Sequence, residues 1–407
     1  MKLFQKLIVA PATLGLLIPS AAFAEEIKLA ELSNYSSSKE VKSISDFNTA
    51  EELAVTNSRV DGLESRFNNF EAGSFSDTTT MSGSAGFLIG AESLNGDANE
   101  ALMTEYFFEI DLNTSFTGDD KLNIEFETGN HMGAGVGKDK EGIDWGSDNG
   151  DTLAVSDLNY TFPLGGWTVA VGDSMDASKT WPNACAMNNM VDNLGDCGAA
   201  NSVDLSGDVS FSASKEFGDG WELGLGISAD SGETTRGMFT KEGDDMYGVA
   251  LGYEAETYGF TVAYSMKEKT DLEANDAGSE KAGGEWDALD TQKDTTYYGL
   301  VGYYSPESVP VTFSGGVELS DVEGTDTDKT QWTVGVSTEL GEGTLSANIG
   351  TNGAIKDDDA EEMAYDLSYE YPINDSTSIT PFVYIVEDST ANTDDAVGLG
   401  TFVSFSF

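Results

Sequence analysis

The chain has 407 residues, of which 72 are acidic and only 20 are basic, giving a formal net charge of −52. A surface this negative repels nucleic acid and argues against any nucleic-acid partner. The 46 glycines, the 8 prolines and an aromatic content of 10% indicate many closely packed strands rather than a disordered chain.

Residues 1–24 have the three parts of a secretory signal peptide. Lys2 and Lys6 form the positive start, residues 7–18 the apolar segment, and Ala22-Phe23-Ala24 the cleavage site. The apolar segment is shorter than the ~20 residues that a membrane-spanning helix needs, which favours a cleaved signal over a retained anchor. Without it, 18 basic and 72 acidic side chains remain, a net charge of −54.

Two segments precede the main domain. Residues 25–52 are polar and indicate a linker or the remnant of a wall-binding module. Residues 53–73 then predict a short coiled-coil helix, because apolar side chains recur at alternating spacings of three and four. Its expected seam is Leu53, Val60, Leu63, Phe67 and Phe70. The helix could pair with identical chains or pack on its own chain, and we expect it on the periplasmic side.

Residues 80–407 alternate with a period of two, which is typical of strands with one apolar face. In residues 105–116 the even positions are mostly apolar, whereas the odd positions include Glu105, Glu109 and Asp111. The next segment repeats the pattern with Glu125 and Glu127 on its polar side. The pattern recurs about sixteen times, although fourteen or eighteen strands would also fit.

The connections between these strands alternate in length. Residues 117–120, 163–166, 256–259 and 341–343 form tight turns, whereas residues 130–151, 173–206, 267–294, 320–329 and 351–362 form long, mostly acidic loops. This order is expected of an up-and-down outer-membrane barrel and not of a soluble β-sandwich. The last strand ends on Phe407, which we interpret as a barrel-assembly signal.

The predicted fold is therefore all-β: a closed antiparallel up-and-down transmembrane β-barrel of about 16 strands, preceded by a short N-terminal coiled-coil helix. A sheet can span a bilayer only if it closes, because unpaired backbone groups are too costly in hydrocarbon. Sixteen strands leave a water-filled lumen. Glu105, Glu109, Asp111, Glu125 and Glu127 are the candidate pore-lining acids, since they face away from the apolar side.

The long loop at residues 173–206 contains the only two cysteines, Cys185 and Cys197. In an exported protein these are expected to form a disulfide. A loop stapled in this way could fold inward as a constriction loop or remain on the outer surface, and the sequence leaves both alternatives open.

Four segments carry a resemblance to a known family: residues 1–11 (MKLFQKLIVAP), 57–67 (NSRVDGLESRF) and 78–87 (TTTMSGSAGF), and the terminal Phe407. Together they resemble cyanobacterial outer-membrane porins of the carbohydrate-selective (OprB-like) family, also called iron-uptake porins. The resemblance implies passive passage of sugars, inorganic ions or iron, and a homotrimer. Residues 41–47 (VKSISDF) resemble only the opening of the surface-layer-homology module that family members carry, and residues 25–52 are too short for a whole module.

Enzymatic chemistry has little support in the sequence, so we expect no enzyme, no cofactor and no specific metal site. The single histidine, His131, lies in a long loop without a neighbouring metal ligand, and the acidic run 356–362 lacks the spacing of a calcium loop. Weak binding of divalent cations at acidic loops remains an expectation.

The expected function is passive diffusion of small hydrophilic solutes through an acidic, cation-favouring outer-membrane porin, in contact with lipid and lipopolysaccharide. One alternative is a structural or envelope-tethering outer-membrane protein with a closed lumen. Another is a secreted soluble β-protein.

Overall fold

The computed structural model describes residues 78–93, 102–130, 150–230, 232, 237–240, 244–268, 294–323, 328–356, 361–387 and 395–407. The chain divides into two units, Met1–Ser74 and Phe75–Phe407, and all described residues belong to the second. The predicted signal peptide, linker and coiled-coil helix lie outside the described residues, as does His131.

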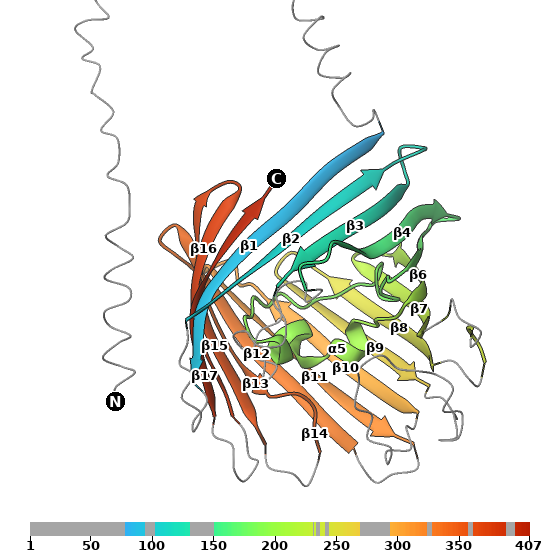
Figure 1. The fold of residues 1–407 in the computed structure, drawn as a ribbon. Coiled ribbons are helices and arrows are strands. Elements are labelled where there is room, and N and C mark those ends of the chain that lie inside the picture. The colour runs from blue at the N-terminus through green and yellow to red at the C-terminus, as the bar shows by residue number, and fades with distance from the viewer. Residues whose placement is uncertain are drawn as a thin grey trace, which may run out of the picture. The chain divides into compact units, whose positions relative to one another are not determined.

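The described residues form an almost entirely β structure (Figure 1). Its strands are β1 (Thr79–Ser93), β2 (Met103–Thr114), β3 (Lys121–Gly129), β4 (Ala154–Leu164), β5 (Trp167–Asp173), β6 (Val209–Phe217), β7 (Trp221–Asp230), β8 (Asp244–Glu254), β9 (Tyr258–Lys267), β10 (Thr295–Tyr304), β11 (Val311–Val322), β12 (Asp328–Leu340), β13 (Gly343–Thr351), β14 (Ile355–Lys356), β15 (Met363–Asn374), β16 (Thr377–Val386) and β17 (Ala396–Ser406). Two short helical elements, η3 (Asp192–Gly198) and α5 (Ala200–Val203), interrupt the series between β5 and β6.

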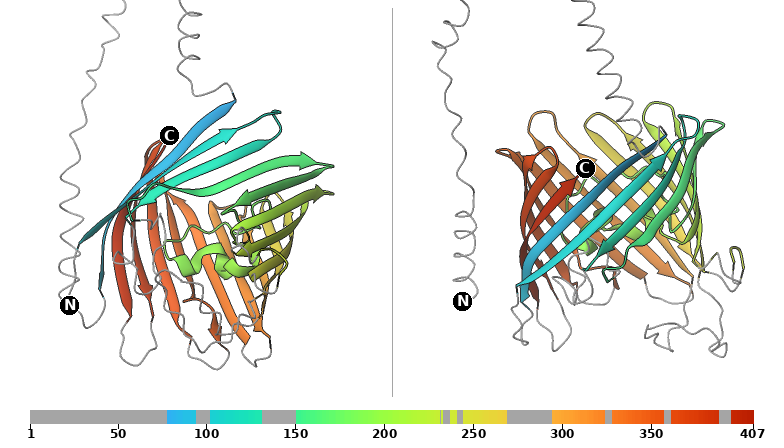
Figure 2. Two further views of the ribbon diagram at one scale, coloured as in Figure 1. Left: turned by 45° about the vertical axis from the view of Figure 1, so that its right-hand side comes forward. Right: turned by 45° about the horizontal axis from the view of Figure 1, so that its top comes forward.

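Sixteen of these strands form one closed antiparallel barrel (Figure 2). Each pairs with its neighbours in the chain, β13 pairs with β15, and β1 pairs with both β2 and β17, which closes the ring. The two-residue β14 is an additional pairing with β12. The structure therefore confirms the predicted closed barrel of sixteen strands.

The outer face of the barrel is apolar. In β7, Leu225 points outward and is 42% exposed. Its neighbours Gly224 and Gly226 lie on the inner face, where the indole of Trp181, from the β5–β6 connection, covers them. The same alternation exposes large apolar side chains on other strands, including Phe87, Phe211, Val262, Leu300, Leu319, Val334 and Leu367. Polar side chains point inward, among them Ser210, Ser212, Ser214, Thr261, Ser265 and Asn348. Period two thus places opposite chemistries on the two faces.

Connections at one end are short, and most of those at the other are longer. The short ones are residues 115–120, 165–166, 218–220, 255–257, 305–310, 341–342 and 375–376. Gly165 and Gly166 both have positive φ, as a two-residue hairpin of the primed type requires. At the closure, Gly83 and the terminal Phe407 exchange two backbone hydrogen bonds, of 3.0 and 3.1 Å. The final residue is therefore part of the seam.

Asp120 stabilises the first short turn. Its Oδ1 accepts hydrogen bonds from the Ser115 hydroxyl and the backbone N–H groups of Phe116 and Thr117, each 2.9 Å long. Its Oδ2 accepts one of 2.6 Å from the Tyr160 hydroxyl. These donors, led by Tyr160, hold the pKa of the Asp120 carboxyl well below its usual range. The turn is therefore built around an ionised carboxylate.

Candidate functional site

The candidate site is the barrel lumen together with residues 174–208, which we call the inner loop. The inner loop connects β5 to β6 and carries η3 and α5, which lie within the barrel rather than above it (Figure 1). Cys185 and Cys197 form a disulfide in this loop, as predicted. Of the two positions that the sequence left open for the loop, the structure shows the inward one.

The first half of the inner loop packs against glycines of the inner wall. The indole of Trp181 covers β7 so closely that a Cβ on Gly224 would lie 2.7 Å from its Cδ1, and one on Gly226 2.8 Å from its Cζ2. Gly252 on β8 leaves similar room for Pro182. The absence of side chains at these positions is what allows the loop to lie flat on the wall.

Hydrogen bonds then fix the loop to successive strands. The Oγ of Ser212 on β6 accepts from the backbone N–H of Thr180. Thr261 on β9 accepts from the N–H of Ala184, and Ser314 on β11 accepts from that of Ala186. The inward-facing hydroxyl groups of β6, β9 and β11 therefore satisfy backbone donors of the loop.

The second half of the loop is fixed by carboxylates of the wall. Asp366 on β15 accepts the backbone N–H groups of Met190 and Val191. Glu318 on β11 accepts the backbone N–H of Ser202 and the side-chain amide of Asn201. The loop thus follows the inner wall from β6 to β15.

Two apolar clusters fill the space between the loop and the wall. One consists of Leu88, Val191, Leu194, Ala364, Phe382, Tyr384, Val386 and Ala396. The other consists of Ala177, Trp181, Cys197, Ala199, Val203, Leu205, Met246, Ala250, Ala263 and Val301. Part of the lumen is therefore a packed core rather than water-filled space, which the sequence did not predict.

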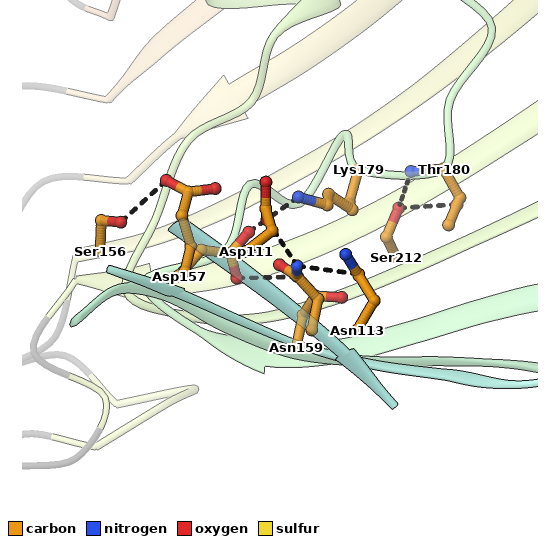
Figure 3. Close-up of polar contacts among 10 residues, drawn as sticks. Asp111, Asn113, Ser156, Asp157, Asn159, Lys179, Thr180 and Ser212 are labelled. Atoms are coloured by element: carbon orange, nitrogen blue, oxygen red, sulfur yellow. Dashed lines mark hydrogen bonds and ion pairs between the residues drawn. The ribbon is translucent and has the colours of Figure 1, made fainter. Parts of the chain in front are cut away.

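The inner face of β2, β3 and β4 is different and forms an acidic wall. Asn123 donates to Asp111 at 2.7 Å, and Asn159 donates to the Asn123 oxygen at 3.2 Å and to Asp157 at 2.9 Å. Ser156 donates to Glu125 at 2.8 Å. Figure 3 shows these polar groups converging across three neighbouring strands.

One lysine of the inner loop reaches this acidic wall. Lys179 Nζ lies 2.7 Å from Asp157 Oδ2 (Figure 3). Burial acts to lower the pKa of Lys179, but the hydrogen bond and the charge of Asp157 raise it above its ordinary value. Among the described residues this is the ion pair that joins the inner loop to β4.

The predicted pore-lining acids share the inner face with Asp157. Strand register places Glu109 beside Glu127 and Asp111 beside Glu125, and Glu125 beside Asp157. Since Asp157 points at the inner loop, these five carboxylates belong to the lumen side.

Glu105 lies on the same face, but its side chain is only 6% exposed. It is therefore covered by protein, whereas its position in the alternating pattern predicted contact with pore water.

Two acids of the inner loop add to the negative charge. The side chain of Asp176 is exposed, but the surrounding protein within the barrel partly desolvates its carboxyl. This desolvation, together with the negative charge of Asp204, raises the pKa of Asp176 to about 6. Burial and Asp204 also raise the pKa of Asp196 to about 6. Both carboxylates are ionised at neutral pH and titrate just below it.

Sequence reasoning missed Asp157, Lys179, Glu318 and Asp366. The alternation marks Asp157, Glu318 and Asp366 as inward positions, but it does not show that the inner loop contacts them. Lys179 is the only basic residue of the inner loop, and this isolated charge was an available signal.

Metal ligands do not gather in the described part of the chain, where no three His, Cys, Asp or Glu side chains could hold one ion. The predicted acidic run at 356–362 lies partly outside the described residues. No helix among the described residues is long and apolar enough to cross a membrane.

Similarity to one solved outer-membrane protein structure supports the fold. No family model matches the chain. An uncharacterized protein of Nostoc sp. (strain PCC 7120) is 26% identical over 416 residues, which cover 88% of this chain and 70% of that protein. A loop-deletion mutant of OmpT, an outer membrane protein of Vibrio cholerae, has a TM-score of 0.54 at 12% identity, covering 81% of this chain and 100% of that one. A mutant of the Rhodopseudomonas blastica porin has a TM-score of 0.49 at 14% identity, with the same coverage.

Proposed function

We propose that this protein is an outer-membrane porin through which small hydrophilic solutes diffuse passively, and that its passage favours cations. An apolar outer face on all sides of a closed barrel suits hydrocarbon, because in water it would be a very large exposed apolar surface. The proposal includes no enzymatic step.

The observation that carries the proposal is the division of the lumen into two sides. The inner loop packs on the wall from β6 round to β17 and β1. Toward the acidic wall of β2 to β4, the described side-chain hydrogen bond of the loop is the one from Lys179 to Asp157. The proposed passage runs between the inner loop and this acidic wall. Carboxylates that line a pore attract cations and repel anions.

Several finer features belong to the same proposal. Inorganic cations, including iron, fit the carboxylates, and sugars fit the amide and hydroxyl groups of the acidic wall. The resemblance to carbohydrate-selective porins suggests a homotrimer with the N-terminal helix on the periplasmic side. Divalent cations would bind weakly at the acidic loops.

Planar bilayer recording tests the function. The folded protein is expected to give stepwise conductance, and its reversal potential in a KCl gradient should show a preference for potassium over chloride. Replacing Glu109 and Glu125 by glutamine should weaken that preference, because two of the five carboxylates of the acidic wall are removed. The Asp119→Asn, Asp375→Asn double variant removes two charges in exposed short turns, away from the inner face, and serves as the matched control.

Folded wild-type protein that gives no conductance would refute the porin assignment. Conductance with unchanged selectivity in the Glu109→Gln, Glu125→Gln double variant would refute the acidic passage.

A second candidate, an envelope-tethering protein with a closed lumen, is favoured by one observation. The two apolar clusters lie between the inner loop and the wall, so part of the interior is packed. This candidate predicts a folded barrel that inserts into bilayers and carries no current.

A further inference from the structure

Two carboxylates are buried beneath the inner loop, on strands far apart in the chain. Glu318 on β11 is 2% exposed and Asp366 on β15 is 5% exposed. Burying a carboxylate is costly unless its oxygens are fully hydrogen-bonded. Both side chains obtain most of their partners from the inner loop.

Glu318 is surrounded by hydrogen-bond donors. Its Oε1 accepts from Asn201 Nδ2 at 3.0 Å, and its Oε2 accepts from the backbone N–H of Ser202 at 2.8 Å and from the Ser202 hydroxyl at 2.7 Å. The Asn201 amide cannot reverse, because its Oδ1 already accepts from Lys267 Nζ at 3.1 Å. The site therefore requires acceptors only, which a carboxylate supplies and an amide does not.

Asp366 is in the same situation. Its Oδ2 accepts from the backbone N–H groups of Met190 at 2.8 Å and Val191 at 3.2 Å, and its Oδ1 accepts from Asn348 Nδ2 at 2.7 Å. Asn348 Nδ2 also donates to the Asn188 carbonyl at 2.8 Å, which fixes the orientation of that amide. An asparagine at position 366 would again place one donor against another.

The two carboxylates hold different parts of the loop. Asp366 binds residues 190 and 191, inside the ring closed by the Cys185–Cys197 disulfide, and Glu318 binds residues 201 and 202, just after that ring. The disulfide limits the shape of the ring, and Cys197 Sγ lies 3.2 Å from the Ser314 hydroxyl on β11, but the covalent bond itself joins only loop residues.

We propose that Glu318 and Asp366 are positioning residues that hold the inner loop against β11 and β15, and so keep the passage along the acidic wall at a constant width. This role rests on the proposed function, but the attachment of the loop can be measured without it. Losing a buried carboxylate that accepts several hydrogen bonds costs more free energy than losing a neutral acceptor, because the donors around it are left unpaired.

Limited digestion of the folded protein in detergent tests the attachment. A protease that cleaves before aspartate can cut at Asp192, inside the disulfide ring, or at Asp204, outside it. Asp366→Asn should raise cleavage at Asp192 about tenfold, and Glu318→Gln should raise cleavage at Asp204 about tenfold, since one charged hydrogen-bond set is lost in each. On a denaturing gel, the fragments from cleavage at Asp192 separate only after the disulfide is reduced, whereas those from cleavage at Asp204 separate without reduction.

Asp375→Asn is the control for loss of one carboxylate, and unboiled gel migration shows whether the barrel is folded. If Glu318→Gln fails to fold, Ser202→Ala removes one donor while keeping the carboxylate, and should raise cleavage at Asp204 less. Folded variants that are cleaved at the wild-type rate at both aspartates would overturn the proposal.

Single-channel recording separates a positioning role from a purely structural one, because a residue that only stabilises the fold would not change the steadiness of the open current level. The wild type should show a steady open level, and the folded Glu318→Gln and Asp366→Asn variants should fluctuate among several levels because the loop intrudes on the passage. Steady wild-type levels in both variants would contradict the positioning role. A wild type without current but with the expected cleavage pattern would refute the proposed function and leave the attachment of the loop intact.

Discussion

Lowering the pH from 7.5 to 5 is expected to weaken the cation preference of the passage. Enclosure by the barrel and the negative charge of Asp204 raise the pKa values of Asp176 and Asp196 to about 6. A raised carboxyl pKa means that the proton is gained at a higher pH than usual. Both groups are therefore negative at neutral pH and become neutral within the range tested.

The size of the change follows from these pKa values. A carboxyl with a pKa of about 6 is about 97% ionised at pH 7.5 and about 9% ionised at pH 5. The two aspartates together therefore lose almost two negative charges. Lys179 keeps its positive charge throughout, because its pKa lies above the ordinary lysine value. The net change in the inner loop is toward positive charge, which favours chloride.

The assay is the reversal potential of single channels in a KCl gradient at the two pH values. A double variant, Asp176→Asn with Asp196→Asn, is the matched comparison, because it has already lost both titrating groups. It should be less cation-selective than the wild type at pH 7.5 and change much less on acidification. An equal change in the variant and the wild type would refute the assignment of the titration to these aspartates.

Three further predictions concern the barrel and the loop. Leu225→Lys should reduce insertion into vesicles, since a lysine facing lipid near mid-bilayer costs about 2–4 kcal/mol, whereas Glu109→Lys on the inner face should insert normally; equal insertion would contradict the assigned faces. Gly226→Val should expose the inner loop to protease without unfolding the barrel, because overpacking costs about 1–3 kcal/mol; unchanged digestion would show that the indole does not rest on β7. Replacing Cys185 and Cys197 by serine should remove about 3 kcal/mol of loop constraint, seen as faster digestion of the loop, and faster melting of the strands would instead place the disulfide in barrel stability.

The barrel could be predicted because the outward-facing positions of its strands are repeatedly apolar, which produces a period of two in the sequence. Leu225 and Leu319 are exposed on the outer face, and their neighbours along the strand are small or polar, namely Gly224, Gly226, Glu318 and Ser320. A register error by one residue would reverse both faces, so the pattern is specified at each strand. The closing strand pair and the alternating connections follow from the same repeat.

The position of the inner loop could not be predicted in the same way. Whether a long loop folds inward depends on the fit between its side chains and the wall, here Trp181 against Gly224 and Gly226. Alternate glycines along one strand were a signal for close approach of another segment. Their partner could be identified only in three dimensions.

Inward carboxylates also look alike in a sequence although their surroundings differ. Glu109 lies on the acidic wall, whereas Glu318 is buried beneath the inner loop. Both occupy polar positions of an alternating strand, so the pattern gives them the same role. They differ because the inner loop, which is distant in the sequence, covers Glu318 but does not cover Glu109 in the same way.

Access of a water-soluble thiol reagent to single introduced cysteines tests most directly whether the passage lies along the acidic wall. Both native cysteines are bonded to each other, so they give no background reaction. A positively charged reagent should reduce the conductance of Glu109→Cys, on the acidic wall, and leave Val301→Cys unmodified, since Val301 is buried beneath the inner loop. Reaction at position 301 with none at position 109 would place the passage on the opposite side of the lumen and contradict the account.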